Sequence, residues 1–204
     1  STQSMVRRAT SQTTCDVAIA PNGLACTTWL DADTHSYYQI TDSDTGQVVV
    51  AAVQLPSTAT MPRVYALGPY FIVTFLATVS AATHLQYIVV PVTNPSVPKT
   101  AADIFAGASS LTAAYDGMVV DNILCIALNC SDGGGAIRTF AMTSQYLYSH
   151  NIPTANVTVA TADVLTLTID SSTVGFPIIW VSYSHLVSTT NTTSTFALNF
   201  DLTT

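Results

Sequence analysis

Glutamate is absent from the 204-residue chain, and five lysines and arginines stand against twelve acidic residues. Charged residues make up only 8% of the sequence, whereas an ordinary globular domain has about a quarter. So few cations argue against nucleic-acid binding through phosphates, which needs clustered lysine or arginine. The surface must instead be covered largely by Ser, Thr, Asn and Gln, which suits a protein embedded in an assembly or exposed outside a cell.

Long apolar runs are also missing. The most apolar stretch, residues 70–76, is far shorter than the roughly 20 residues that a membrane-spanning helix needs. Residues 1–14 are polar, contain Arg7 and Arg8, and lack the apolar core of a signal peptide. We therefore expect residues 1–14 to form an N-terminal arm or linker and predict no membrane span.

Motifs of the common enzyme classes are lacking. Ser109 and Ser110 follow Gly107 without the closing glycine of a nucleophile elbow. The glycines at 133–135 precede a strand-like run instead of a helix, which argues against a phosphate loop or dinucleotide fingerprint. No paired carboxylates occur at a spacing typical of a glycosidase. We expect no catalytic, cofactor-binding or metal-binding residue, and hence no enzyme.

Four cysteines are present at positions 15, 26, 125 and 130. Their spacing fits no common zinc pattern. Cys26 and Cys125 lie inside strand-like runs, where a buried free thiol is the ordinary expectation. A Cys15–Cys26 or Cys125–Cys130 disulfide is the alternative, so the redox compartment stays undecided.

Strand signals dominate what the sequence does contain. Val, Ile, Thr, Tyr and Phe occur in short runs bounded by Gly, Pro, Asn and Asp, the pattern of strands and turns. The one candidate helix is the Ala-rich segment 100–108. The same region, at 99–107, is where a fourth strand of the second repeat described next would fall.

The strand-like runs recur in units of up to four. A strongly apolar second strand follows a Gly/Pro-containing turn, at 21–23 in the first unit and at Gly68 and Pro69 in the second. The first unit comprises 16–19, 24–30, 37–41 and 47–55, and the second 63–67, 70–77 and 85–92. The third comprises 111–119, 122–129, 136–143 and 156–160, and the fourth 164–169, 177–182 and 194–202.

The spacing of these units favours an all-β, β-propeller-like array. The second strands begin near Leu24, Tyr70, Ile123 and Ile178, at offsets of 46, 53 and 55 residues. Four-stranded repeats of roughly 40–50 residues are typical of propeller blades. A β-sandwich or jelly roll is the alternative, but it does not explain the recurring apolar second strand. We predict about three and a half blades over residues 15–204, an incomplete ring whose last unit lacks its fourth strand.

Two groups of polar residues are candidate metal sites. Asp42 begins a segment resembling a calcium loop, but the twelfth position, where an EF-hand needs glutamate, is Val53. Ordinary turn aspartates are the simpler interpretation. The acidic group comprises Asp31, Asp33, Asp42 and Asp44.

Histidines form the second group. His35, His84 and His185 are expected in the turns that follow second strands, and the fourth histidine is His150. Equivalent turns of neighbouring blades lie too far apart to share one ion, so we expect these turn histidines to be exposed to solvent.

Tyrosines are frequent in or beside the expected strands. Strand tyrosines usually fill the space between sheets and satisfy their hydroxyls at the edge. A sugar-stacking platform is the alternative, and Tyr37 and Tyr38 are its candidate ligand contacts.

The blade pattern carries a family resemblance. The segment Asn22-Gly-Leu-Ala-Cys-Thr-Thr-Trp29, followed by a turn and Tyr37-Tyr-Gln-Ile-Thr41, resembles blades of the propeller-containing tail hub or nozzle proteins of short-tailed bacteriophages. The resemblance covers the blade pattern over residues 15–202 and carries no functional residue. It implies a structural virion protein that assembles with other virion proteins, as a homo-oligomeric ring around the DNA channel, without binding nucleic acid specifically.

Two other functions stay open. A glycan-binding adhesin or receptor-binding propeller would recognise a host glycan through rim loops and tyrosines, and would be extracellular. A jelly-roll capsid or decoration protein would show two packed sheets without blades.

Overall fold

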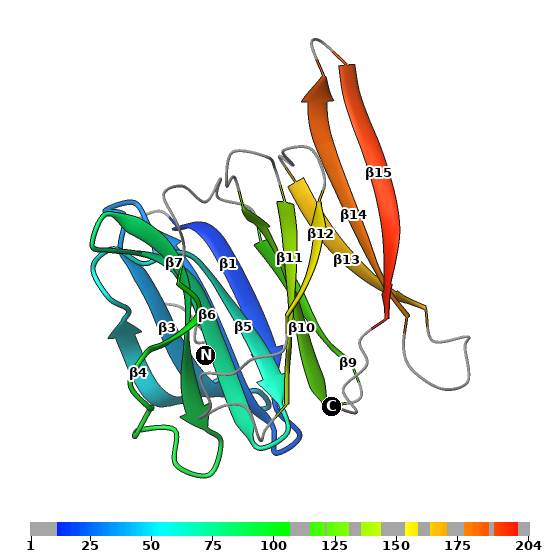
Figure 1. Ribbon diagram of the computed structural model, residues 1–204. Helices are drawn as coiled ribbons and strands as arrows, with labels where there is room; N and C mark the ends of the chain where they lie inside the picture. Colours follow the sequence, from blue (N-terminus) through cyan, green and yellow to red (C-terminus); the bar gives the residue numbers. More distant parts are fainter. Residues whose placement is uncertain are drawn as a thin grey trace. The chain divides into compact units, whose positions relative to one another are not determined.

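The computed structural model describes residues 12–106, 115–120, 122–130, 136–143, 154–158, 164–170, 178–187 and 190–199 (Figure 1). These residues form fifteen β-strands and contain no helix. It follows that no helix in this part of the chain could cross a membrane. The chain divides into two compact units, Ser1–Gly107 and Ala108–Thr204.

The first unit holds two four-stranded antiparallel sheets, here called blade 1 and blade 2 (Figure 1). In both sheets the spatial order of the strands is their order in the sequence. Blade 1 consists of β1 (Gln12–Ile19), β2 (Leu24–Asp31), β3 (Ser36–Asp42) and β4 (Val48–Gln54). Blade 2 consists of β5 (Thr60–Leu67), β6 (Tyr70–Val79), β7 (Ala82–Pro91) and β8 (Ala102–Phe105).

The second unit holds two further antiparallel sheets, blade 3 with four strands and blade 4 with three. Blade 3 consists of β9 (Tyr115–Val120), β10 (Ile123–Cys130), β11 (Ala136–Met142) and β12 (Thr154–Thr158). Blade 4 consists of β13 (Val164–Asp170), β14 (Ile178–Val187) and β15 (Thr190–Asn199). The predicted fold class, an all-β array of four-stranded, propeller-like blades, is thus confirmed, and the fourth sheet has three strands among the described residues.

Several elements differ from the prediction, among them the following three. The candidate helix at 100–108 is wrong, because Ala102–Phe105 forms strand β8, paired with β7. Pairing with a neighbouring strand there outweighs the helix propensity of alanine. Strand β1 begins at Gln12, so the end of the expected arm belongs to blade 1, and β15 begins at Thr190, not at 194.

Backbone conformation explains why the turns stand where they do. Gly23, between β1 and β2, has φ +83°, in the left-handed region that glycine adopts without a steric penalty. Ser80 and Ala81 join β6 to β7 with φ of 50° and 68°. A two-residue hairpin with both φ values positive is the turn whose twist matches that of the flanking strands.

Successive blades pack through their first strands. Strand β5 packs against β1 and β2, and strand β13 packs in the same way against β9 and β10. The interface between blades 1 and 2 is an apolar core, to which blade 1 contributes Cys26, Tyr38 and Ile40. Blade 2 contributes alternate residues of β6, among them Phe71 and Phe75, both fully buried. This alternation is expected of a strand that turns every second side chain to one face.

Hydrogen bonds cross the same interface beside the apolar core. Asp16 Oδ2 accepts the backbone N–H of Val64 at 3.0 Å. The Thr28 hydroxyl donates to the Pro62 carbonyl at 3.4 Å, and the Ser36 hydroxyl donates to the Ala59 carbonyl at 2.8 Å. These bonds fix β5 and the segment before it against blade 1.

Candidate functional site

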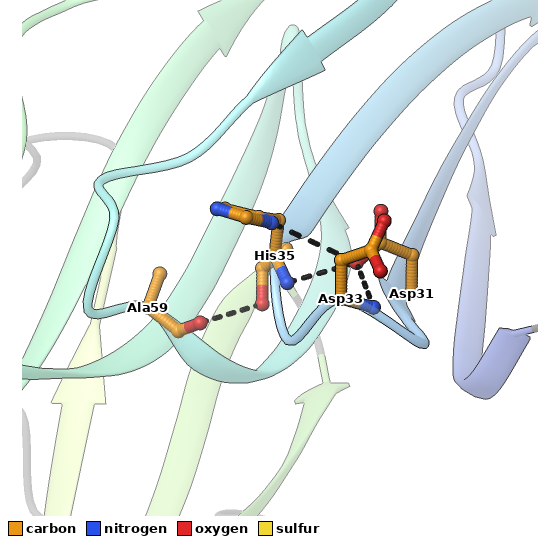
Figure 2. A network of polar contacts seen from close by, with 5 residues as sticks. Asp31, Asp33, His35 and Ala59 are labelled. Atoms are coloured by element: carbon orange, nitrogen blue, oxygen red, sulfur yellow. Dashed lines mark hydrogen bonds and ion pairs between the residues drawn. The ribbon is translucent and has the colours of Figure 1, made fainter. Parts of the chain in front are cut away.

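The loop between β2 and β3 is built around the carboxylate of Asp31 (Figure 2). Asp31 Oδ1 accepts the backbone N–H of Asp33 at 3.1 Å and that of His35 at 2.9 Å. His35 Nδ1 lies 4.0 Å from the same oxygen, and its side chain is 41% exposed. Asp31 itself is buried, so its oxygen is committed to closing the turn and is not presented to a ligand.

The second acidic loop, between β3 and β4, is closed in a similar way by Asp42. Asp42 Oδ1 accepts the backbone N–H groups of Asp44 at 3.1 Å and Thr45 at 2.8 Å, and the Thr45 hydroxyl at 2.8 Å. Hydrogen bonds from Thr45, the largest cause, hold the pKa of Asp42 below its ordinary value. The carboxylate is thus an ionised acceptor that shapes its own turn.

The four aspartates do not converge on one point. Asp31 ends β2, whereas Asp42 ends β3, so the two loops lie at opposite ends of a seven-residue strand. Such a strand is about 20 Å long. Within the described part of the chain, no group of three or more His, Cys, Asp or Glu side chains could hold a metal ion.

The histidines are only partly where the sequence places them. His35 lies in the loop after β2, as predicted. His84 and His185 lie inside strands β7 and β14, opposite Ala77 and Thr192, so their assignment to turns is wrong. The apolar runs were expected to end earlier than β6 and β14 do, which shifted both turns. His150 lies outside the described residues.

His84 is a half-buried histidine beside an acid, not an exposed turn residue. Its side chain is 13% exposed, and its Nδ1 lies 3.2 Å from Oδ2 of Asp103 in β8. The other carboxylate oxygen, Oδ1, accepts the side-chain N–H of Gln86 at 2.9 Å. His84 and Gln86 are two residues apart in β7 and therefore lie on one face, with Asp103 directly opposite Gln86.

The two tyrosines predicted as ligand contacts are buried. Tyr37 is 7% exposed and stacks on Trp29 with ring centroids 5.6 Å apart, and Tyr38 is 1% exposed. Consecutive residues of a strand point to opposite faces, so the two rings cannot form one platform. Burial raises the pKa of Tyr38 to about 12, with a smaller contribution from Cys26. Both rings therefore act in packing in this structure, which is the ordinary role of strand tyrosines, although the buried Tyr38 hydroxyl has no hydrogen-bond partner among the described residues.

Three of the four cysteines are shown as free thiols in the described part of the structure. Cys15 is exposed, whereas Cys26 and Cys125 are buried, and all three are free. Cys15 lies opposite Trp29 and Cys26 opposite Ala18, which places them on opposite faces of the β1–β2 hairpin. Cys125 and Cys130 belong to one extended strand, β10, at a separation of about 17 Å. The opposite directions exclude the first pairing and the separation along β10 excludes the second, so neither considered disulfide forms in this structure.

An exposed apolar row on β1 was not predicted. Val17 and Ile19 are 52% and 61% exposed and share one face of β1 with the free Cys15. The opposite face of the strand turns Asp16 toward β5. In β5, the corresponding strand of blade 2, Val64, Tyr65 and Leu67 are all at most 8% exposed. The first strand of blade 1 is therefore covered on one face, whereas that of blade 2 is covered on both.

The outer edge strand of blade 1, β4, is also uncharged and exposed. Val48 and Val49 are 42% and 45% exposed. The pairing of β4 with β3 shifts register twice, and each shift adds one residue on β4. Such bulges twist an edge and hinder further strand pairing. The edge of β4 is therefore a poor template for strand pairing with a second chain.

A shallow cavity of about 330 Å³ lies where two equivalent turns of blades 1 and 2 meet. Its walls are almost entirely apolar, and backbone hydrogen bonds such as Val92 N–H to the Pro69 carbonyl fix them. The residues that line it are Pro21, Asn22, Gly68, Pro69, Val92 and Thr93. The correspondence of the two turns was predicted from the sequence; the cavity between them was not.

Comparisons with known proteins reveal similar folds but do not identify a functional site. No protein-family model and no curated protein matches the chain. Among solved structures, an ulvan lyase of polysaccharide lyase family PL25 with bound -[GlcA(1-4)Rha3S]- superimposes with a TM-score of 0.51 at 10% identity. A second ulvan lyase structure of that family gives 0.50 at 9% identity. Each match covers 81% of this chain but only 44% of the lyase chain. The chain thus shares an all-β fold with part of these enzymes.

Proposed function

We propose that this protein is a non-catalytic structural component that assembles by packing blade against blade, and that it is part of a virion, as in the tail hub or nozzle of a short-tailed bacteriophage. The observation that carries the proposal is the exposure of Val17 and Ile19 on β1, where the equivalent strand β5 is covered on both faces. Within the first unit, blade 2 packs on the opposite face of β1 and β2, which carries Asp16 and Cys26, so the face of Val17 and Ile19 is not used by that contact. Exposed apolar surface of this kind often marks a protein–protein interaction site.

Charge and composition support the same function. Charged residues make up 8% of the chain, and Val17 and Ile19 have an uncharged neighbour, Cys15, on their face of the strand. Interfaces of permanent assemblies are depleted of charge in their centres. The bulges of β4 favour contact through the face of β1 over edge-to-edge pairing. The excess of acidic over basic residues also suits a ring around DNA, because a lumen poor in lysine and arginine would not retain the DNA phosphates.

Light scattering at increasing protein concentration tests the assembly. We expect a mass several times the 21.5 kDa of one chain, and a shift toward that single-chain mass in the double variant Val17→Lys/Ile19→Lys. The matched control is Val48→Lys/Val49→Lys, which adds the same charge to exposed valines of β4 and should leave the mass unchanged. A single-chain mass at every concentration, or equal effects of the two variants, would refute the proposal.

Carbohydrate binding is the second candidate. It is favoured by the fold shared with polysaccharide lyases, one of them with a bound saccharide. With five lysines and arginines in the chain, a neutral glycan is a better ligand than an acidic one. Glycan-array binding by the purified protein would support this candidate, and binding to no glycan on the array would count against it. Tyr37 and Tyr38 are buried, so such a ligand would have to contact other residues.

A further inference from the structure

The third strand of blade 4 lies at the edge of its sheet. In blades 1, 2 and 3 the third strands, β3, β7 and β11, each pair with a neighbour on both sides. Strand β15 holds the same position in blade 4, but among the described residues it pairs only with β14 (Figure 1). One side of β15 therefore presents a row of backbone N–H and C=O groups that no described strand satisfies.

The outer edges of the other three blades carry features that hinder pairing with a further strand. Strand β4 is bulged twice against β3, and β8 is four residues long with an interrupted register. Strand β12 has only five residues. Short edge strands and bulges are common means by which proteins prevent edge-to-edge association.

Strand β15 has none of these features. It is ten residues long and pairs with β14 over its whole length without a shift in register. Its sequence contains no charged residue and no proline, the residue types that commonly protect an edge. A long, uncharged and regular edge is the kind of edge to which another strand can add.

The register of the β14–β15 hairpin identifies the backbone groups that face the free edge. Two residues separate its closing pair, Val187 and Thr190, and the closing pair of a two-residue hairpin is a hydrogen-bonded one. Hydrogen-bonded and non-hydrogen-bonded pairs alternate along an antiparallel ladder. Thr190 and every second residue after it are therefore bonded to β14, whereas Asn191, Thr193 and the following odd-numbered residues direct their N–H and C=O groups away from β14.

We propose that β15 pairs antiparallel with β15 of a second copy of this chain, so that the two copies of blade 4 join into one sheet. Of the outer strands that a second copy presents, β4, β8, β12 and β15, only β15 matches the free edge in length and regularity. Self-pairing across a twofold axis offers each copy the same row of donors and acceptors. It opposes no like charges, because β15 carries none.

The pairing goes beyond the assembly proposed above and is expected to be weak. It uses a backbone edge of blade 4 and no residue of blade 1. A single added strand pair forms an interface smaller than the roughly 1,200 Å² at which stable complexes begin. We therefore expect a dissociation constant of about 10–100 μM, so that pairs form in concentrated protein or between copies that an assembly already holds close together.

Hydrogen exchange resolved to single amides by mass spectrometry, at about 1 μM and about 300 μM protein, tests the pairing. We expect the amides of Thr193 and Thr195, which face the free edge, to exchange about three- to ten-fold more slowly at the higher concentration. The amides of Thr192 and Ser194, which are bonded to β14, should change little. The same difference should persist in Val17→Lys/Ile19→Lys, which separates this pairing from association through β1.

Two substitutions at Thr193 separate edge pairing from a structural effect. Proline removes the N–H that faces the free edge and no ladder bond to β14, so Thr193→Pro should abolish the concentration dependence at Thr195. Protection of Ser194 in this variant shows that the hairpin still forms. Thr193→Val keeps the N–H group and a β-branched side chain, and as the matched control it should retain the concentration dependence.

Two results would overturn the proposal. The first is exchange of Thr193 and Thr195 at the same rate at both concentrations in the unaltered protein: fast exchange throughout means an edge that stays open, and slow exchange throughout means an edge covered within the single chain. The second is a concentration dependence at Thr195 that survives Thr193→Pro.

Discussion

The carboxylate of Asp16 in β1 accepts a hydrogen bond of 3.0 Å from the backbone N–H of Val64 in β5. Its other oxygen accepts the N–H of Val17, also at 3.0 Å. A side chain of one blade thereby satisfies a main-chain donor in the next blade, where the two first strands pack and no ladder pairs them. Blade packing in the first unit is therefore specified by polar geometry as well as by the apolar core.

Removal of this link should destabilise the first unit. Asp16→Ala leaves the Val64 N–H without its acceptor in a partly buried position. We expect the free energy of unfolding to fall by about 1.5–3 kcal/mol, the usual cost for a hydrogen bond to a charged group. Urea denaturation measures the change. Asp33→Ala, at an exposed aspartate of the same blade, should change stability by no more than about 0.5 kcal/mol; equal effects of the two substitutions would argue against a specific link.

The apolar core between blades 1 and 2 should be sensitive to lost volume. Phe71 is fully buried in it, so Phe71→Ala should cost about 3–5 kcal/mol through lost burial and an unfilled cavity. Thermal and urea unfolding report the change. Val49→Ala, at a 45% exposed position of β4, serves as the comparison and should cost less than about 0.5 kcal/mol. A small effect of Phe71→Ala would mean that the two blades do not share this core.

Substitutions of Gly23, in the turn between β1 and β2, should lower the free energy of unfolding only through the backbone conformation at this position. At φ +83°, an added Cβ on Gly23 would meet Ser43 Oγ at an ordinary contact distance of 3.8 Å. Gly23→Ala should therefore cost about 1–2 kcal/mol for the left-handed conformation and nothing for a clash. Gly23→Asn should cost less, because asparagine tolerates this region. Identical losses in both variants, measured by urea denaturation, would point to a steric cause instead.

Alkaline pH should destabilise the fold. Burial raises the pKa of the Cys125 thiol to about 12 and that of Tyr38 to about 12, and it raises the pKa of the Cys26 thiol further. The unfolded chain releases these protons at lower pH than the folded chain, so the folded state binds more protons above about pH 9. Stability is then fully present below the unfolded pKa values and falls as pH rises through the interval up to the folded ones.

Urea denaturation at pH 7, 9 and 10 measures this decline. Cys125→Ala should make the decline shallower by removing one group that titrates differently in the two states. Cys15→Ala, at an exposed thiol, is the matched control and should leave the slope unchanged. Stability that is constant from pH 7 to 10 would contradict the burial of these groups.

Much of the fold follows from local sequence signals, and the site features do not. The strands β2, β3, β6 and β7 were predicted within a few residues, because each is an apolar or β-branched run bounded by turn residues. Strand β8 lies in the Ala-rich segment 100–108, which favours a helix in isolation, and its pairing with β7 makes it extended. Local propensity cannot report such a long-range partner.

The neighbours of individual side chains were harder to predict for the same reason. The contact of His84 with Asp103 depends on the β7–β8 register, which an irregularity interrupts. Strand alternation places Tyr37 and Tyr38 on opposite faces of β3 once the strand is known. Their burial requires that both faces of β3 are covered, which depends on how the sheets pack. The exposure of Val17 and Ile19 is likewise visible only once β5 is seen to cover one face of β1.

Electron microscopy of the purified protein tests the central claim, that the blades of this chain assemble, most directly. Class averages at micromolar concentration should show particles with rotational symmetry, built from several 21.5 kDa chains, and Val17→Lys/Ile19→Lys should remove them. Particles of single-chain size in the unaltered protein, or symmetric particles that persist in the double variant, would contradict it.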